Sequence, residues 1–248
     1  MSCEACRTIP PVIPQGYAPK GTYQALAGLN TYITGPRDAN TAIVDIYDIF
    51  GLSSQTIQGA DILSTRLNAL VLIPDFFHGD GAKHEWLPAD TEEKTSKLMG
   101  FVGSKADIPK NVDVLVETVK VYRRTFSSVK TWGSLGLCWG GKVAVLASGE
   151  GTLFNATAQV HPGRLETSDA EKLTIPHLVL ASKDEPTDAV KGYADIISKN
   201  GHGGLVGTYE TMWHGWMGAR ADLEKEESLK EYVRGYAQAA EFFEKYLK

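Results

Sequence analysis

The sequence predicts an α/β fold with a mostly parallel central sheet and helices on both faces. Expected strands alternate with helical segments of about 10 to 20 residues, which is typical of this class. Most of these strands are apolar throughout, as in a sheet that is buried on both faces. No internal repeat or linker divides the 248 residues. We therefore expect a single domain over residues 1–248, with residues 1–20 as an irregular N-terminal extension.

The first half of the chain supplies one edge and the centre of the sheet. One or two edge strands are expected in 23–35, and buried strands in 41–47 and 70–76, because the latter are aliphatic or β-branched. Between these buried strands lies a helix that Ser53 or Ser54 caps. A long loop over 76–91 precedes helices at 91–102 and 107–125. The second helix carries an apolar stripe, formed by Val112, Leu115, Val116, Val119 and Tyr122.

The second half continues the alternation. It begins with a strand at about 129–136 and a helix at about 139–148. Strands at 156–161 and 175–182 follow, and Thr187 is a possible cap for the next helix, beyond whose end Gly201 lies. The chain closes with a strand at 204–210 and a helix at about 225–247. The apolar face of this last helix comprises Leu229, Val233, Tyr236, Ala240 and Phe243.

The charge and hydropathy patterns exclude several classes of partner. The net charge is −5 and no basic block occurs, so nucleic acid is not expected as a partner. No run approaches the roughly 18 apolar residues of a membrane span. The N-terminus lacks the apolar stretch of a secretory signal. We expect a cytoplasmic protein, a monomer or homodimer, with no membrane partner.

Cys3 and Cys6 form a C-x-x-C motif at the N-terminus. A redox or metal role for such a motif needs a βαβ context or a second pair of ligands, and the sequence shows neither. We therefore interpret the pair as part of a reduced, poorly ordered tail.

The third cysteine, Cys138, lies in a G-x-C-x-G turn between a strand and a helix. This is the cysteine form of the nucleophile elbow, whose strained turn projects the nucleophile into a site. Gly136 and Gly140 relieve the crowding between strand and helix. The helix that starts at Trp139 directs its positive end at the thiol and favours the thiolate. The alternative is a Gly-rich packing turn with a buried, inert Cys138.

The elbow predicts an acid and then a histidine, each after a later strand. Asp184 follows the strand at 175–182, and His214 follows the strand at 204–210. Glu185 and Asp188 are competing acids, and both Asp184 and His214 have alternative interpretations as ordinary loop residues. The order and the setting of all three favour a site composed of Cys138, Asp184 and His214.

Five further segments carry a resemblance to a known family. They are "DIYDIFG" at 45–51, "PDFFHGDG" at 74–81, "GLCWGGK" at 136–142, "VHPG" at 160–163 and "HGWMGAR" at 214–220. With them, the chain resembles the dienelactone hydrolase family of α/β-hydrolases, and its N-terminal region resembles the fungal branch. The resemblance implies the α/β-hydrolase fold, no cofactor, and a Cys-Asp-His triad at Cys138, Asp184 and His214.

The expected activity is hydrolysis of a small ester or lactone through a thioester acyl-enzyme. Backbone amides of Trp139 and of a residue near Ile49 are expected to form the oxyanion hole. The resemblance places Asp48 at the position of an acid that gates ionisation of the cysteine, since a nearby carboxylate disfavours the thiolate. The alternative for Asp48 is a turn or cap residue.

Arg220, Trp216 and Tyr47 are the candidate substrate-binding residues. No arginine occurs between Arg66 and Arg123, and Lys83 or Lys94 would be poor replacements for a second substrate-binding arginine. We therefore expect a substrate bulkier or less anionic than dienelactone.

Other histidines suggest no metal site. The segment "HGDGAKHE" offers four candidate ligands, His78, Asp80, His84 and Glu85. Their spacing is flexible and Gly-rich, so no metal is expected. His161 is interpreted as a hydrogen-bonded structural histidine near the site.

Two other classes of function stay open at this point. One is a non-catalytic ligand-binding protein on the same fold, although the complete set of triad residues argues against this. The other is an acyltransferase, thioesterase or peptidase that uses the same cysteine.

Overall fold

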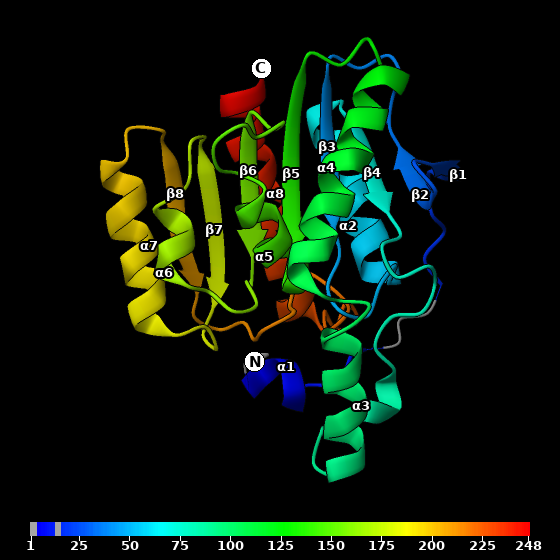
Figure 1. The fold of residues 1–248 in the computed structure, drawn as a ribbon, viewed down its shortest axis with the longest axis vertical. Helices are drawn as coiled ribbons and strands as arrows, with labels where there is room; N and C mark the ends of the chain where they lie inside the picture. The colour runs from blue at the N-terminus through cyan, green and yellow to red at the C-terminus, as the bar shows by residue number, and fades with distance from the viewer. Residues whose placement is uncertain (1–3, 13–15) are drawn as a thin grey trace.

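A computed structural model describes residues 4–12 and 16–248, and its central feature is an eight-stranded sheet (Figure 1). The strand order is β1-β2-β4-β3-β5-β6-β7-β8. The β1–β2 and β2–β4 pairs are antiparallel and the other pairs are parallel, which confirms the predicted class. The strands are β1 (Thr22–Leu26), β2 (Leu29–Thr34), β3 (Thr41–Ile46), β4 (Leu70–Pro74), β5 (Thr131–Leu137), β6 (Ala156–Val160), β7 (His177–Ser182) and β8 (Gly204–Tyr209).

Helices cover both faces of the sheet (Figure 1). On one face, α2 (Ser54–Leu67) packs against α8 (Glu226–Leu247). The other face carries α4 (Ile108–Thr125), α5 (Trp139–Leu146), α6 (Thr167–Ala170) and α7 (Thr187–Lys199). The short η1 (His84–Trp86) and α3 (Glu92–Val102) contact each other in the long connection that follows β4.

Local signals place the helix starts. Ser53 is the N-cap of α2, because its hydroxyl accepts the amide N–H of Thr56. Thr91 and Asp107 cap α3 and α4 in the same way. The prediction of Thr187 as a cap is wrong: α7 begins at Thr187 itself, and Pro186 holds the cap position without a side-chain bond.

The core lies on both sides of the parallel strands. Every residue of β3, β4, β6 and β7 is buried, as the apolar runs predicted. The stripes on the two long helices are buried in part. In α4, Leu115, Val119 and Tyr122 are buried, while Val112 and Val116 are partly exposed. In α8, Leu229 at the N-terminal end is 38% exposed.

The N-terminal extension is not wholly irregular, contrary to prediction. It contains the short helix α1 (Glu4–Thr8), which lies beyond the carboxyl ends of the parallel strands (Figure 1). Cys6 within it is only 3% exposed, so for this residue the interpretation as a poorly ordered tail is wrong; Cys3 lies outside the described residues. Among the described helices, none combines the length and the apolar character that a bilayer crossing requires.

Candidate active site

Cys138 lies in a strained turn between β5 and α5. Its φ is 53° and its ψ is −110°, a conformation that a non-glycine residue rarely adopts. A Cβ on Gly136 would lie 2.2 Å from the carbonyl oxygen of Gly140, and a Cβ on Gly140 would lie 2.0 Å from that of Ile46. Both glycines are therefore required by backbone approach, as predicted from the elbow pattern.

The histidine meets the cysteine as predicted, but a different acid meets the histidine. Nε2 of His214 lies 3.0 Å from Sγ of Cys138. Nδ1 of His214 lies 2.6 Å from Oε1 of Glu185, whose other oxygen accepts the amide N–H of Ser182. The prediction of Asp184 as the ring's partner is wrong in this structure: its carboxylate accepts the backbone N–H of His214, at 2.8 Å.

The turn after β7 explains this exchange. Asp184 is exposed and reaches only the backbone of His214, whereas Glu185 is 6% exposed and reaches the ring with its longer side chain. Asp188, the third candidate acid, is exposed in the first turn of α7. No signal in the sequence separates the two adjacent acids, because which one points inward depends on how the turn packs.

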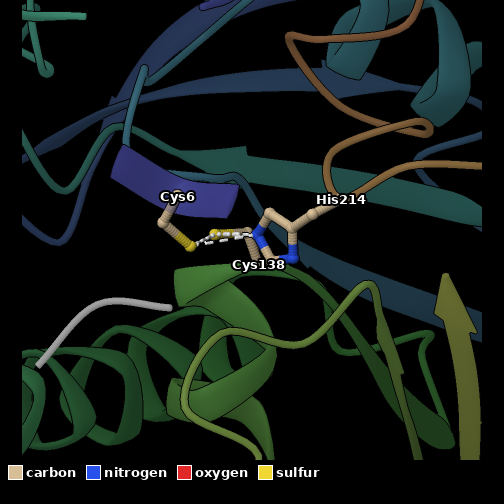
Figure 2. Close-up of side chains that lie close together, drawn as sticks. All are labelled: Cys6, Cys138 and His214. Atoms are coloured by element: carbon tan, nitrogen blue, oxygen red, sulfur yellow. Dashed lines mark hydrogen bonds between the residues drawn. The ribbon is translucent and has the colours of Figure 1, made fainter. Parts of the chain in front are cut away.

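A second thiol joins the pair (Figure 2). Sγ of Cys6 lies 3.8 Å from Sγ of Cys138 and 3.2 Å from Nε2 of His214. All three side chains are buried. The N-terminal helix α1 therefore places a thiol directly over the elbow.

Arg220 holds this N-terminal segment in place. Its Nε donates to the carbonyl oxygen of Ile9 at 2.6 Å, and its Nη2 donates to that of Cys6 at 3.1 Å. The side chain is 1% exposed and its guanidinium lies 4.9 Å from the ring centroid of Phe50. The predicted substrate-binding arginine thus binds the protein's own backbone here.

The surroundings favour the thiolate of Cys138. The hydrogen bond from Cys6 is the largest influence and lowers the pKa of Cys138, which lies well below its usual value. The charges of His214 and Arg220, together with the hydrogen bond to His214, act in the same direction, while burial opposes them.

Asp48 is fully buried near this thiol. Burial, and then the charge of Cys138, raise its pKa to about 6. Its two carboxylate oxygens accept the amide N–H groups of Phe50, at 2.9 Å, and Ala219, at 2.8 Å. These two hydrogen bonds agree with the alternative interpretation of Asp48 as a turn residue. The carboxylate of Asp48 also interacts electrostatically with Cys138.

A small apolar cavity adjoins Cys138. Ile49 and Trp139, the two predicted oxyanion residues, both line it. It leaves about 40 Å³ for solvent, which is room for very few water molecules. Two cationic residues that the sequence analysis did not single out, Lys142 and Arg164, also border it. Arg164 is exposed, whereas Lys142 is buried and ion-paired with Asp169 at 2.5 Å.

Two predicted substrate residues are core residues instead. Trp216 is fully buried and stacks on Tyr209 with a centroid separation of 4.3 Å. Tyr47 is also fully buried: its hydroxyl donates to Asp75 and accepts the amide N–H of Phe77. Neither lines the cavity beside Cys138. The contacts of both residues in this structure are core contacts, and their role in substrate binding stays a prediction.

The remaining histidine and lysine predictions are partly correct. The ring of His161 lies 5.3 Å from that of His214, so its place near the site is confirmed. Within 4–12 and 16–248, neither ring nitrogen of His161 has a hydrogen-bond partner, so it is not the satisfied residue that was expected. Lys83 and Lys94 form surface ion pairs with Asp80 and Asp90 and do not line the cavity.

Comparison with known proteins identifies the family of the chain. A model of the dienelactone hydrolase family matches residues 29–247. The chain belongs to this family. This dienelactone hydrolase family member is 32% identical over 220 residues to an uncharacterized AIM2 family protein of Schizosaccharomyces pombe, a match that covers 88% of this chain and 87% of the relative. It is 24% identical to the hydrolase pyvD of Aspergillus violaceofuscus, covering 92% and 91% of the two chains.

Solved structures show the same fold at lower sequence identity. The dienelactone hydrolase of Anabaena variabilis matches with a TM-score of 0.66 and 16% identity, and the match covers 96% of this chain and 100% of that one. The fold is therefore that of the α/β-hydrolases, and the chain is a member of a hydrolase family.

Proposed function

We propose that this dienelactone hydrolase family member hydrolyses a small ester or lactone through Cys138, His214 and Glu185. One observation carries the proposal: a continuous chain of contacts runs from the Cys138 thiol through both ring nitrogens of His214 to a buried carboxylate. This is the order of nucleophile, base and orienting acid that nucleophilic acyl transfer requires. The acid is Glu185 rather than Asp184.

The first half-reaction forms a thioester. The Cys138 thiolate attacks the carbonyl carbon, and the carbonyl oxygen becomes an oxyanion. The amide of Trp139, an N-terminal amide of α5 with no intrahelical acceptor, is one proposed donor to it, and the amide of Ile49 is the other. As the tetrahedral intermediate collapses, the C–O bond breaks and imidazolium His214 gives its proton to the leaving alkoxide.

The second half-reaction uses water. Neutral His214 takes a proton from water, and the resulting hydroxide attacks the thioester carbonyl. The carboxylic acid leaves, and Cys138 returns as the thiolate beside imidazolium His214. Glu185 holds the proton on Nδ1 throughout, so that Nε2 faces the sulfur.

Asp48 is proposed to oppose ionisation of Cys138 before substrate binds. Its pKa of about 6 is raised in part by the cysteine, and the interaction is mutual because each negative charge disfavours the other. Its hydrogen bonds to the amides of Phe50 and Ala219 fix the distance at which this repulsion acts.

Substrate entry requires the N-terminal segment to move. Cys138 is 1% exposed and the cavity beside it holds only about 40 Å³ of solvent, too little for an ester. Withdrawal of α1 would remove Cys6 from the thiol and release Arg220 from the carbonyls of Cys6 and Ile9. The uncovered guanidinium would then be available to a polar group of the substrate.

A panel of aryl esters and lactones tests the proposal. Wild type is expected to hydrolyse some members, with a thioester adduct of Cys138 visible by intact mass after acid quench. Cys138→Ala and His214→Gln should each lose at least 10³-fold in kcat/KM. His202→Gln, which changes an exposed histidine, is the matched control and should retain wild-type activity.

The outcomes separate the other classes of function. Undiminished turnover by Cys138→Ala contradicts the assignment of the nucleophile. Transfer of the acyl group to an added alcohol or thiol in preference to water would identify an acyltransferase. Stoichiometric ligand binding without turnover of any ester, thioester or amide would identify a non-catalytic binding protein.

A further inference from the structure

Three metal-ligating atoms converge above the elbow (Figure 2). They are Sγ of Cys6, Sγ of Cys138 and Nε2 of His214, and they are separated by 3.8, 3.2 and 3.0 Å. The C-x-x-C motif lacked a second ligand pair in the sequence. The fold brings Cys138 and His214 to Cys6 and supplies that pair.

The spacing matches a tetrahedral zinc site. Two thiolates at zinc–sulfur distances of about 2.3 Å and a tetrahedral angle lie about 3.8 Å apart, which is the separation of the two sulfurs here. In the same geometry a sulfur and an imidazole nitrogen lie about 3.6 Å apart, so the ring has to withdraw by only about half an ångström.

The surroundings of His214 are those of a zinc ligand. The other ring nitrogen, Nδ1, lies 2.6 Å from the buried carboxylate of Glu185. Such a carboxylate fixes the ring's tautomer and orientation and increases the basicity of the nitrogen that binds the metal. The catalytic contact to Glu185 therefore also prepares Nε2 for metal binding.

Cys6 is held in position by contacts that need no metal. Arg220 binds the carbonyl oxygens of Cys6 and Ile9, and the carbonyl of Arg7 accepts the amide N–H of Ala89 at 2.8 Å. Two soft thiolate sulfurs and a borderline imidazole nitrogen select zinc over magnesium or calcium. The ligand set is thus pre-positioned and selective.

We propose that Cys6, Cys138 and His214 form a Zn²⁺ site. On binding, the two thiols and Nε2 of His214 lose any protons they still carry to solvent, and two Zn–S bonds and one Zn–N bond replace three bonds from the hydrated ion to water. The consequence for activity rests on the proposed function: bound zinc holds the hydrolase inactive, because two of its ligands are the nucleophile and the base. Withdrawal of α1 removes one ligand and releases the metal.

Zinc binding is measured directly, without any substrate. The metal-free, reduced protein is titrated with Zn²⁺ in competition with a chromophoric chelator, and Co²⁺ replaces zinc to report thiolate ligation by its near-ultraviolet charge-transfer absorption. Wild type should bind one equivalent. Cys6→Ser should bind at least 10²-fold more weakly and lose part of the cobalt–thiolate absorption. Thermal unfolding of each metal-free variant verifies that it is folded.

Two control variants identify the ligands. His84→Gln removes a histidine from the competing loop at 78–85 and should bind zinc as wild type does. Cys3→Ser should retain the three-ligand site. The proposal is overturned if Cys6→Ser binds zinc as tightly as wild type does, including the case in which Cys3→Ser binds it more weakly. It is also overturned if His84→Gln loses as much zinc affinity as Cys6→Ser does.

The effect on activity is a separate measurement. Zinc should inhibit ester hydrolysis by wild type, a chelator should restore it, and inhibition of Cys6→Ser should require at least 10²-fold more zinc. If no ester is hydrolysed but zinc binds through Cys6, the proposed function fails and the metal site stands. If esters are hydrolysed and Cys6→Ser binds zinc as wild type does, only the metal site fails.

Discussion

Replacing Glu185 by glutamine tests which acid serves His214. The Glu185 carboxylate lies 2.6 Å from Nδ1 and its side chain is only 2% exposed, so the substitution removes a buried charge and almost no volume. Asp184→Asn is the matched variant, since it changes the adjacent acid in the same way. The asparagine oxygen can still accept the backbone N–H of His214.

The structure gives the size of the expected loss. A carboxylate and an imidazolium whose charge centres lie about 4 Å apart attract by about 4 kcal/mol at an effective dielectric constant of about 20. Loss of that stabilisation lowers the fraction of free enzyme that holds the thiolate–imidazolium pair, and it corresponds to about 10³-fold in kcat/KM. The glutamine amide also donates toward Nδ1 and so favours the wrong tautomer, which adds to the loss. Asp184→Asn, at an exposed position, should change the rate by about twofold at most.

The assay is kcat/KM for the best ester of the panel, measured beside circular dichroism and thermal unfolding of each variant. Glu185→Asp is a useful third variant, because it retains the charge but shortens the reach to the ring. We expect the order wild type and Asp184→Asn, then Glu185→Asp, then Glu185→Gln. A loss that is larger in Asp184→Asn than in Glu185→Gln would refute the reasoning from the ring contact.

Three further predictions follow from the same site. Burial raises the pKa of Asp48 from 3.8 to about 6, so its ionisation destabilises the folded protein as pH rises through that window, and the effect is absent below about pH 4. In urea titrations, the free energy of unfolding of wild type should therefore fall relative to that of Asp48→Asn by up to about 3 kcal/mol between pH 4 and 8. Parallel curves of this free energy against pH would contradict the prediction. Arg220→Lys loses the guanidinium fork whose Nε and Nη2 bind two carbonyls of the N-terminal segment, so α1 should be held more weakly. Alkylation of Cys138 by a bulky maleimide, read on the Cys138 peptide, should then accelerate about tenfold. An unchanged rate would show that Arg220 does not hold α1. Gly136→Ala places a methyl against the Gly140 carbonyl and should lower the free energy of unfolding by more than about 3 kcal/mol. This loss should appear as a fall in Tm of at least about 6 °C, and a smaller fall would mean that the turn can relax.

Some predictions that stay open concern the setting of the protein rather than the site. Its cytoplasmic location and its state as monomer or homodimer remain predictions. So does the preference for a substrate bulkier or less anionic than dienelactone.

The sequence by itself determined the fold class and the elbow. Apolar strand runs and amphipathic stripes are local patterns, and they follow directly from burial on two faces or on one. Gly136 and Gly140 are also readable locally, because only glycine tolerates the backbone approach that the elbow imposes. The order of nucleophile, acid and histidine then placed Cys138 and His214 together, since the carboxyl ends of parallel strands share one edge of the sheet.

Only the tertiary structure decided which side chains fill that edge. Asp184 and Glu185 are adjacent and chemically alike, and the packing of one turn directs Glu185 to the ring of His214 and Asp184 to its backbone N–H. Cys6 reaches the elbow across 132 residues of chain, on a helix too short to be predicted from periodicity. Arg220 binds that same segment instead of facing an open pocket. Contacts of this range depend on the relative placement of whole elements, which no local pattern of residues encodes.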